Sequence, residues 1–214
     1  MFKVDLHVHT IYSGDALIGP EEAVLWAKKA GLDGLAITDH DTLRGAERAR
    51  PVAEREGVVL IPGVEVESRG GHILALGVSE PPEPGGSLAE VLEAVEDQGG
   101  VSVLAHPFNL LAPRGWSYRE LVRLDAVEVV NASQILFPIS RRLAVRLAEA
   151  LGKPMVAGSD AHLPEAVGKA FTIFEACGDE DDLLEALRKG MVRPCGGRME
   201  LSLILRKMAI PSYL

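Results

Sequence analysis

The sequence has little of several features that mark common protein classes. Its 214 residues include only two cysteines. Cys177 and Cys195 form no CxxC pair, and two thiols are too few for a disulfide framework. No run approaches the roughly 18 uncharged apolar residues that would span a bilayer, so no transmembrane segment is expected. The N-terminus lacks a basic segment followed by an apolar one, which argues against a signal peptide and leaves a cytoplasmic location as the expectation.

Basic residues are outnumbered by acidic ones. There are 22 Lys and Arg against 31 Asp and Glu, which gives a formal charge of −9. Proteins that bind long nucleic acid or anionic membranes usually carry a basic footprint, so we expect neither partner. A phosphorylated substrate stays open, because bound divalent cations reverse the local field at a site made of His and carboxylates.

The composition that is present is that of an ordinary globular protein, with 47% apolar and 25% charged residues. The length predicts a single domain, residues 1–214, in which residues 199–214 form a terminal helix or tail. Short β-branched runs alternate with amphipathic stretches that begin at Pro or acidic residues and end at Gly. This alternation is typical of parallel βα units and predicts an α/β fold.

Seven or eight strands are expected from the apolar runs. They cover residues 3–9, 34–39, 58–66, 72–78, 101–106, 126–131, 155–158 and 170–174. Helices are expected from residue 20 to 31, from 87 to 98 and from 179 to 190, where Pro, a Ser-x-x-Glu capping box or acidic residues mark the start. In the tail, Leu201, Ile204, Leu205 and Met208 recur at helical spacing, which favours core packing over a subunit contact.

All six histidines lie at or beside the end of an expected strand, at positions 7, 9, 40, 72, 106 and 162. In a parallel α/β fold or barrel, side chains at the carboxyl ends of different strands converge on one crevice. The sequence therefore predicts that histidines distant along the chain are neighbours in one site.

The first strand ends in an HxH motif. A regular pleat places Asp5, His7 and His9 on one face, and Val4, Leu6 and Val8 on the other. Two imidazoles spaced in this way can bind one metal ion of the Zn, Mn or Fe type. Surface His pairs are common, so the motif is weak by itself. It gains weight from Asp160 and His162, which repeat the same spacing at a later strand end.

Two further candidates follow the first and second strands. Asp15 stands in the loop Tyr12-Ser13-Gly14-Asp15, where a solvated turn or a helix-capping acid is the ordinary interpretation. His40 lies between Asp39 and Asp41 at the end of the second strand. We interpret His40 as a ligand and Asp39 as an orienting residue or a proton donor.

The middle strands contribute three more candidates. Glu65 closes an apolar run, and a buried Glu without a partner carries a large desolvation cost, which a cation would offset. His72 begins its strand instead of ending it, so a structural His is a serious alternative there. His106 closes its strand before Pro107, which interrupts the ladder and lets the imidazole point outward. Asn131, at the next strand end, is expected to support the site by hydrogen bonding, although a plain turn Asn fits almost as well.

These motifs together resemble the PHP (polymerase and histidinol phosphatase) superfamily of metal-dependent phosphoesterases. The resemblance rests on DLHVHT, the following Asp15, ITDHDT, GVE, GHILALG, AHP, VVNAS and GSDAH, and it spans residues 4–168. It implies a distorted (β/α)7 TIM-like barrel, with two or three divalent ions (Zn, Mn or Fe) at the C-terminal ends of the strands. The residues at the ligand positions would be His7, His9, Glu65 and Asp160 for one ion; Glu65, His72 and His106 for a second; and Asp15, His40 and His162 for a third.

The chain departs from the larger members of that superfamily, which insert a helical module between the Glu and AHP motifs. Only about thirty residues separate His72 from His106 here. The site is therefore expected to be more open, or to be covered by the loop of residues 107–116 or by another subunit, and the oligomeric state stays open.

The predicted activity is hydrolysis of a small phosphorylated metabolite, a nucleotide or a short oligonucleotide. A metal-bound hydroxide would attack phosphorus, so no Ser or Cys nucleophile is needed. The alternatives are an amidohydrolase-type metal hydrolase, which would typically add a carboxylated Lys, and a non-catalytic metal-binding structural or accessory module, which missing ligands would favour.

Overall fold

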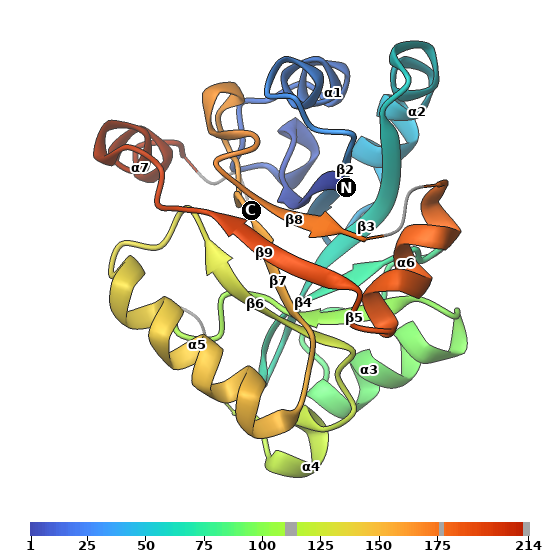
Figure 1. Cartoon of the computed structure of the whole chain (residues 1–214), viewed down its shortest axis with the longest axis vertical. Helices are drawn as coiled ribbons and strands as arrows, with labels where there is room; N and C mark the ends of the chain where they lie inside the picture. The colour runs from blue at the N-terminus through green and yellow to red at the C-terminus, as the bar shows by residue number, and fades with distance from the viewer. Residues whose placement is uncertain (110–114, 176–177, 212–214) are drawn as a thin grey trace.

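The computed structural model describes residues 1–109, 115–175 and 178–211. Cys177 and part of the 107–116 loop lie outside these residues. Nine described strands form one sheet in the order β7-β6-β5-β4-β3-β2-β1-β8-β9, and the helices lie around it (Figure 1). The strands are β1 Phe2–Val8, β2 Gly34–His40, β3 Val59–Ser68, β4 Gly71–Leu76, β5 Val101–Leu104, β6 Ala126–Asn131, β7 Met155–Gly158, β8 Ala170–Phe174 and β9 Val192–Gly196. The helices are α1 Pro20–Lys29, α2 Arg44–Glu56, α3 Leu88–Asp97, α4 Tyr118–Leu121, α5 Phe137–Leu151, α6 Glu180–Arg188 and α7 Leu201–Met208, with short 3₁₀ turns η1 Ile11–Ser13 and η2 Pro164–Ala166.

The sheet curls until its first strand meets its seventh. Val8, at the end of β1, forms a parallel bridge with Ala161, three residues beyond β7. The backbone N–H of His9 donates to the carbonyl of Ala161 at 2.9 Å. Along the same seam the buried carboxylate of Asp5 accepts from the backbone N–H groups of Ser159 (2.8 Å) and Gly168 (2.9 Å). These contacts make β1 to β7 a nearly closed barrel, which confirms the predicted α/β, distorted TIM-like fold.

The distortion lies in strand direction. β1 to β3 are parallel to one another, as are β5 to β7, but β4 runs antiparallel to both β3 and β5. β8 and β9 extend the sheet from β1 as antiparallel strands outside the barrel. The alternating pattern did not predict β9, whose sequence Val-Arg-Pro-Cys-Gly lacks apolar alternation. Pro194 fits there because β9 is an edge strand, where a missing N–H costs no ladder hydrogen bond.

The predicted helices are confirmed at their caps. Ser87 Oγ accepts from the N–H of Glu90, and Glu90 Oε2 accepts from the N–H of Ser87 at 2.7 Å, which is a capping box at the start of α3. At the start of α6, Asp179 Oδ1 accepts from the N–H of Asp182 at 3.2 Å. α7 forms as expected, but its predicted packing face was wrong. Leu203 and Ile204 are buried, whereas Leu201, Leu205 and Met208 are more than half exposed.

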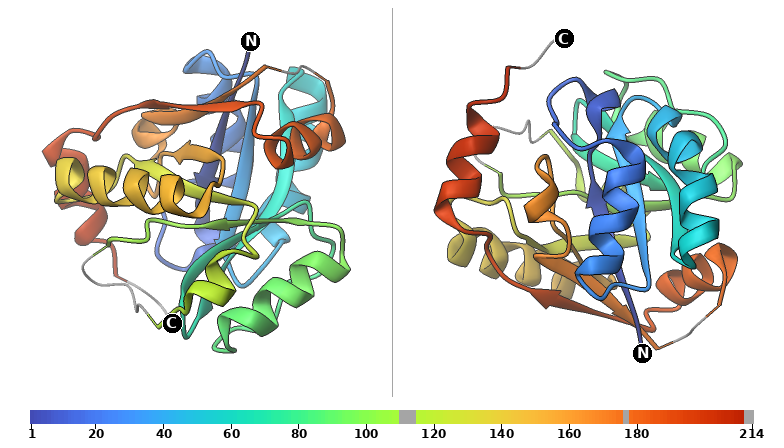
Figure 2. Two further views of the ribbon diagram at one scale, coloured as in Figure 1. Left: turned by 60° about the horizontal axis from the view of Figure 1, so that its bottom comes forward. Right: turned by 90° about the horizontal axis from the view of Figure 1, so that it is seen from above.

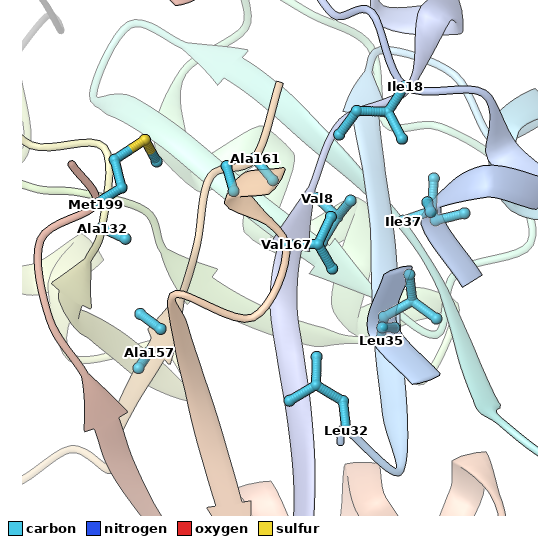
Figure 3. Packing of buried hydrophobic residues seen from close by; sticks show 14 of the residues in the cluster. Val8, Ile18, Leu32, Leu35, Ile37, Ala132, Ala157, Ala161, Val167 and Met199 are labelled. Carbon is cyan, nitrogen blue, oxygen red and sulfur yellow. The ribbon is translucent and has the colours of Figure 1, made fainter. Parts of the chain in front are cut away.

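Two apolar layers hold the barrel in place. Inside it, residues such as Leu6, Ile61, Leu74 and Val103 pack together, and Leu183 of α6 belongs to the same cluster. Outside it, Val8, Leu35 and Ile37 form a second cluster beneath α1 and α2, which also includes Met199 before α7 (Figure 3). The two further views show α1 beside α2 on one flank and α7 at another part of the periphery (Figure 2). Within the described residues, no helix combines the length and apolarity needed to cross a membrane.

Candidate metal centre

A β-bulge in β1 sets the positions of the first two histidines. Between Asp5 and Val8, β1 advances three residues while the paired segment of β2 advances two, so one residue is extra. Leu6 packs inside the barrel, but Val8 packs in the outer cluster. The predicted regular alternation of residues 4–9 was therefore wrong. The Asp5 carboxylate accepts hydrogen bonds at the barrel seam, while the side chains of His7 and His9 both lie beside Glu65 at the end of the barrel.

The imidazole rings of His7 and His9 are oriented by hydrogen bonds at Nδ1, the ring nitrogen that points away from Glu65. His7 Nδ1 lies 3.1 Å from Glu128 Oε1, so it donates a proton to that carboxylate. His9 Nδ1 lies 2.9 Å from Ser13 Oγ, whose own hydrogen goes to Asp39. Both Nε2 atoms are thereby left with a free lone pair, and they stand 3.1 Å apart.

Glu65 occupies the middle of the site with its two oxygens facing different histidines. Oε2 lies 3.2 Å from His7 Nε2 and 3.1 Å from His9 Nε2. Oε1 lies 2.8 Å from His106 Nε2 and 2.9 Å from His72 Nδ1. Burial by itself would raise the pKa of Glu65. The neighbouring imidazoles of His7 and His106 outweigh that effect, so the pKa of Glu65 lies well below its usual range. The carboxylate is thus ionised and placed between two groups of imidazoles.

His72 reaches this site because β4 is antiparallel. It is paired with Glu67 near the carboxyl end of β3, so the first residues of β4 lie at the same barrel end as the last residues of the parallel strands. The prediction had no account of how a residue that begins a strand could join residues that end theirs. His72 is about a fifth exposed, so it lies at the rim of the site.

A second group of side chains surrounds Asp15. Its Oδ2 lies 3.2 Å from His162 Nε2 and 3.5 Å from His40 Nε2. Its other oxygen, Oδ1, is buried, and no described residue offers it a hydrogen bond. An unpaired buried carboxylate oxygen is costly, and a bound cation would satisfy it.

Asp160 connects these groups. Its Oδ1 lies 3.4 Å from His162 Nδ1, 3.6 Å from His9 Nε2 and 4.0 Å from His7 Nε2. Three combinations of potential ligand atoms fall within 4.8 Å of one another: His9, Asp15, His40 and His162; His7, Glu65 and His106; and His7, His9 and Asp160. Imidazole and carboxylate donors suit Zn, Mn and Fe ions, so the donor chemistry fits the predicted metals.

The two predicted non-ligand residues, Asp39 and Asn131, are connected by hydrogen bonds to predicted ligands. Asp39 is buried, and its oxygens accept from Thr10 N–H (2.5 Å), Thr10 Oγ1 (2.8 Å) and Ser13 Oγ (2.9 Å). Ser13 in turn holds His9, so Asp39 lies behind the histidine and not beside the open site. Asn131 donates from Nδ2 to Asp160 Oδ2 (3.3 Å) and to Glu128 Oε2 (3.0 Å).

Glu128 is a functional candidate that the sequence reasoning missed. A bulge in β6 inserts one residue between Glu128 and Val130, so Glu128 and Asn131 share a face although they are three residues apart. Glu128 Oε1 holds His7, and Oε2 accepts from the His106 backbone N–H at 2.8 Å. A carboxylate within the apolar strand Ala-Val-Glu-Val-Val-Asn was the available signal, of the same kind that identified Glu65.

Left-handed backbone occurs at the same end of the barrel. The non-glycine residues with positive φ in the described chain are Asp41, His106 and Asp160. Such conformations cost on the order of 1 to 3 kcal/mol and persist where the surroundings impose them. Two of the three residues belong to the ligand sets, and Asp41 follows His40. The turns that aim these side chains therefore carry part of the strain of the site.

We expect Glu128→Gln to weaken metal binding by about 10- to 100-fold, the usual effect of removing a residue that orients a metal ligand. An amide has only one acceptor oxygen, whereas Glu128 accepts on both sides. If the amide oxygen faces His7, the NH₂ group faces the N–H donors of His106 and Asn131. If instead the amide oxygen faces His106 and Asn131, the NH₂ group faces the N–H at His7 Nδ1, and two donors oppose each other. Isothermal titration with Mn²⁺ measures the loss, with Glu149→Gln on the exposed face of α5 as control. Unchanged affinity would contradict the orienting role.

Comparison with known proteins places the site in a family context. The family model described as PHP domain matches residues 5–135, and the model described as PHP-associated matches residues 138–192. The first match includes seven of the nine predicted ligands, and Asp160 and His162 fall in the second.

Two curated relatives each match a little less than half of the chain. A 5'-3' exoribonuclease of Haemophilus influenzae is 34% identical over 105 residues, which is 47% of this chain and 38% of that protein. A 3',5'-nucleoside bisphosphate phosphatase of Chromobacterium violaceum is 37% identical over 101 residues, 45% of this chain and 34% of that protein. The matched segments thus span little more than a third of either relative.

A solved structure covers nearly the whole fold. A two-domain protein of Bacteroides vulgatus, which contains a predicted PHP-like metal-dependent phosphoesterase, superposes with a TM-score of 0.78 at 21% identity, over 96% of this chain and 68% of that one. The barrel arrangement described above is therefore shared with that protein.

Proposed function

This chain belongs to the PHP domain family, and from that premise we propose that it is a metal-dependent phosphoesterase acting on a small phosphorylated metabolite, a nucleotide or a short oligonucleotide. The observation that carries the proposal is the position of Glu65. Its Oε2 faces His7, His9 and His40, and its Oε1 faces His72 and His106, so this one carboxylate could hold ions together with either set of imidazoles.

The proposed ligands are His7, His9, Asp15, His40, Glu65, His72, His106, Asp160 and His162. When bound, two or three divalent ions of the Zn, Mn or Fe type would lower the pKa of water towards about 7 and neutralise charge on the phosphoryl oxygens. At His9 the protein's own contribution is to keep the imidazole lone pair free. Burial, reinforced by the neighbouring His162, lowers the pKa of His9 well below its usual value, so His9 is held as the neutral ligand form.

We assign positioning roles to Asp39, Asn131 and Glu128. Asp39 fixes His9 through Ser13, Glu128 fixes the ring of His7, and Asn131 holds Asp160 and Glu128 together. For Asp39 this role is favoured over proton donation to a leaving group, because Thr10 and Ser13 occupy its oxygens.

The alternatives predict different behaviour. A non-catalytic metal-binding module would bind ions tightly without turning over any phosphoester. An amidohydrolase-type enzyme would favour cyclic amides over phosphoesters. Within the phosphoesterases, the net charge of −9 favours small or short substrates over long nucleic acid. A cytoplasmic location and a single-domain organisation remain predictions.

A phosphoester panel tests the proposal. The Mn²⁺- or Zn²⁺-loaded protein should release phosphate or nucleoside from at least one of a set of nucleoside monophosphates, 3',5'-bisphosphates, short oligonucleotides, histidinol phosphate and related sugar or amino-alcohol phosphates. His9→Ala should abolish that release, because His9 belongs to two of the three ligand groups. All six histidines lie at the site, so the matched control is Glu96→Gln on α3, an exposed residue paired with Arg123. Tight metal binding without turnover across the panel would favour the structural module.

A further inference from the structure

The C-terminal helix α7 places a lysine inside the ligand cluster. Lys207 Nζ lies 2.9 Å from Asp160 Oδ1 and 2.8 Å from Ser133 Oγ. Asp160 Oδ1 is the same oxygen that faces His7, His9 and His162. Lys207 lies outside both segments that match family models, residues 5–135 and 138–192. It is therefore a feature of this chain that the family comparison does not assign.

The helix is anchored well enough to hold the lysine there. The Met199 N–H donates to the carbonyl of Ala132 at 2.9 Å just before the helix, and Leu203 and Ile204 are buried. On the neighbouring residue, Arg206 pairs with Glu165 of η2 at 3.0 Å. The Arg206–Glu165 pair is largely exposed and contributes little, so the buried residues and the Met199 hydrogen bond fix α7 against the barrel end independently of Lys207, whose side chain is about a quarter exposed.

A purely structural ion pair with Asp160 does not account for the charge of Lys207 once metal ions are bound. If Asp160 ligates a divalent cation, its Oδ1 is taken by that cation, and the ammonium group is left beside a positively charged cluster. An ammonium group in that position is stabilised by an anion that binds the same ions. A phosphoryl group carries oxygens that can face both the metal ions and Lys207.

A cavity of about 110 Å³ lies at this point, with room for several water molecules and hence for a tetrahedral oxyanion. It is lined by the polar residues Asp160, Lys207 and Ser133 and by the apolar residues Ile135 and Met208. The mixed lining suits a phosphate ester that carries an apolar organic group.

We propose that Lys207 is a phosphate-binding residue of this site, and that the cavity between α7 and the segment after β6 receives the phosphorylated end of the substrate. The inference rests on the proposed phosphoesterase function. It adds a substrate contact from a helix outside the matched family segments.

Two titrations on the Mn²⁺-loaded full chain test it. With inorganic phosphate as the probe, Lys207→Ala should bind about tenfold more weakly or worse than the unmodified protein, because one charge-assisted contact is lost. Lys207→Arg should recover part of the affinity. With Mn²⁺ alone, Lys207→Ala should bind equally well or more tightly, because the ammonium no longer competes for Asp160. Opposite effects on the two ligands are the signature of the proposed role.

Arg206→Ala is the matched control, since it removes a neighbouring basic residue and an ion pair of the same helix. It should change neither affinity. Unchanged phosphate affinity in Lys207→Ala would overturn the inference, and so would weaker binding of both Mn²⁺ and phosphate in Lys207→Ala and Arg206→Ala alike, which would show that Lys207 only anchors α7. Because phosphate binding is measured without turnover, a chain that binds phosphate through Lys207 but hydrolyses nothing would contradict the proposed function and not this inference.

Discussion

Replacing Glu65 by Gln is expected to lower kcat/KM by about 10³-fold or more, the largest effect of any single substitution in the site. A metal ion contributes several kcal/mol of charge stabilisation in the transition state, and about 1.4 kcal/mol corresponds to a factor of ten. Glu65 faces five imidazoles through two oxygens, so its loss affects two proposed ligand sets at once. Gln keeps the shape of the side chain but loses the charge and one acceptor oxygen.

The measurement is steady-state kinetics on the substrate found in the panel, combined with counting of bound metal per chain. Glu65→Gln should retain fewer ions, whereas Glu96→Gln on α3 should match the unmodified protein. His72→Ala provides a graded comparison, because His72 contacts only Oε1 and lies at the exposed rim. It should cost less than Glu65→Gln. A Glu65→Gln protein with full metal content and activity would refute the role of Glu65 as a metal ligand.

The sequence was sufficient to predict which residues gather at the site. Strand ends can be recognised from short apolar runs, and parallel strands bring their carboxyl ends together, so His7, His40, His106 and Asp160 could be placed in one crevice before any coordinates. The α/β class and most strand and helix positions followed from the same patterns, whereas the distorted barrel was implied by the family resemblance.

The sequence was not sufficient where the backbone departs from regular geometry. Bulges in β1 and β6 change which residues share a face. No residue type in those strands, such as a glycine, indicates where the extra residue lies. Glu128 was therefore not singled out as a candidate, and Asp5 was grouped with His7. The antiparallel course of β4, which brings His72 to the site, was overlooked although the sequence carried a signal: the predicted strands 58–66 and 72–78 lie too close along the chain for a parallel crossover. The position of Lys207 beside Asp160 could not be predicted, because the spacing of apolar residues in a helix does not indicate which part of the fold the helix packs against.

Removal of bound metal is expected to lower the melting temperature by about 8 to 16 °C. The proposed ligands span the chain from His7 to His162, so the unfolded chain cannot assemble the sites, and ions bind mainly to the folded state. An ion present at about 1,000 times its Kd stabilises the folded protein by about 4.1 kcal/mol. For a chain of this length, each kcal/mol shifts the melting temperature by roughly 2 to 4 °C. The metal-free protein also leaves Asp15 Oδ1 buried without a described partner, which adds to the expected loss.

Differential scanning calorimetry on chelator-treated protein, before and after addition of Mn²⁺ or Zn²⁺, measures this shift. The size of the shift should grow with ion concentration, because stabilisation by a ligand follows mass action. In Glu65→Gln the same additions should raise the melting temperature much less, whereas Glu96→Gln should respond like the unmodified chain. Mg²⁺ distinguishes ion binding from a general salt effect: it prefers an octahedral shell of oxygen ligands and retains water, so a cluster dominated by imidazoles should gain little from it. Equal melting temperatures with and without saturating Mn²⁺ or Zn²⁺ would mean that the buried histidines and carboxylates stabilise one another, and the cluster would then be a polar core and not a metal centre.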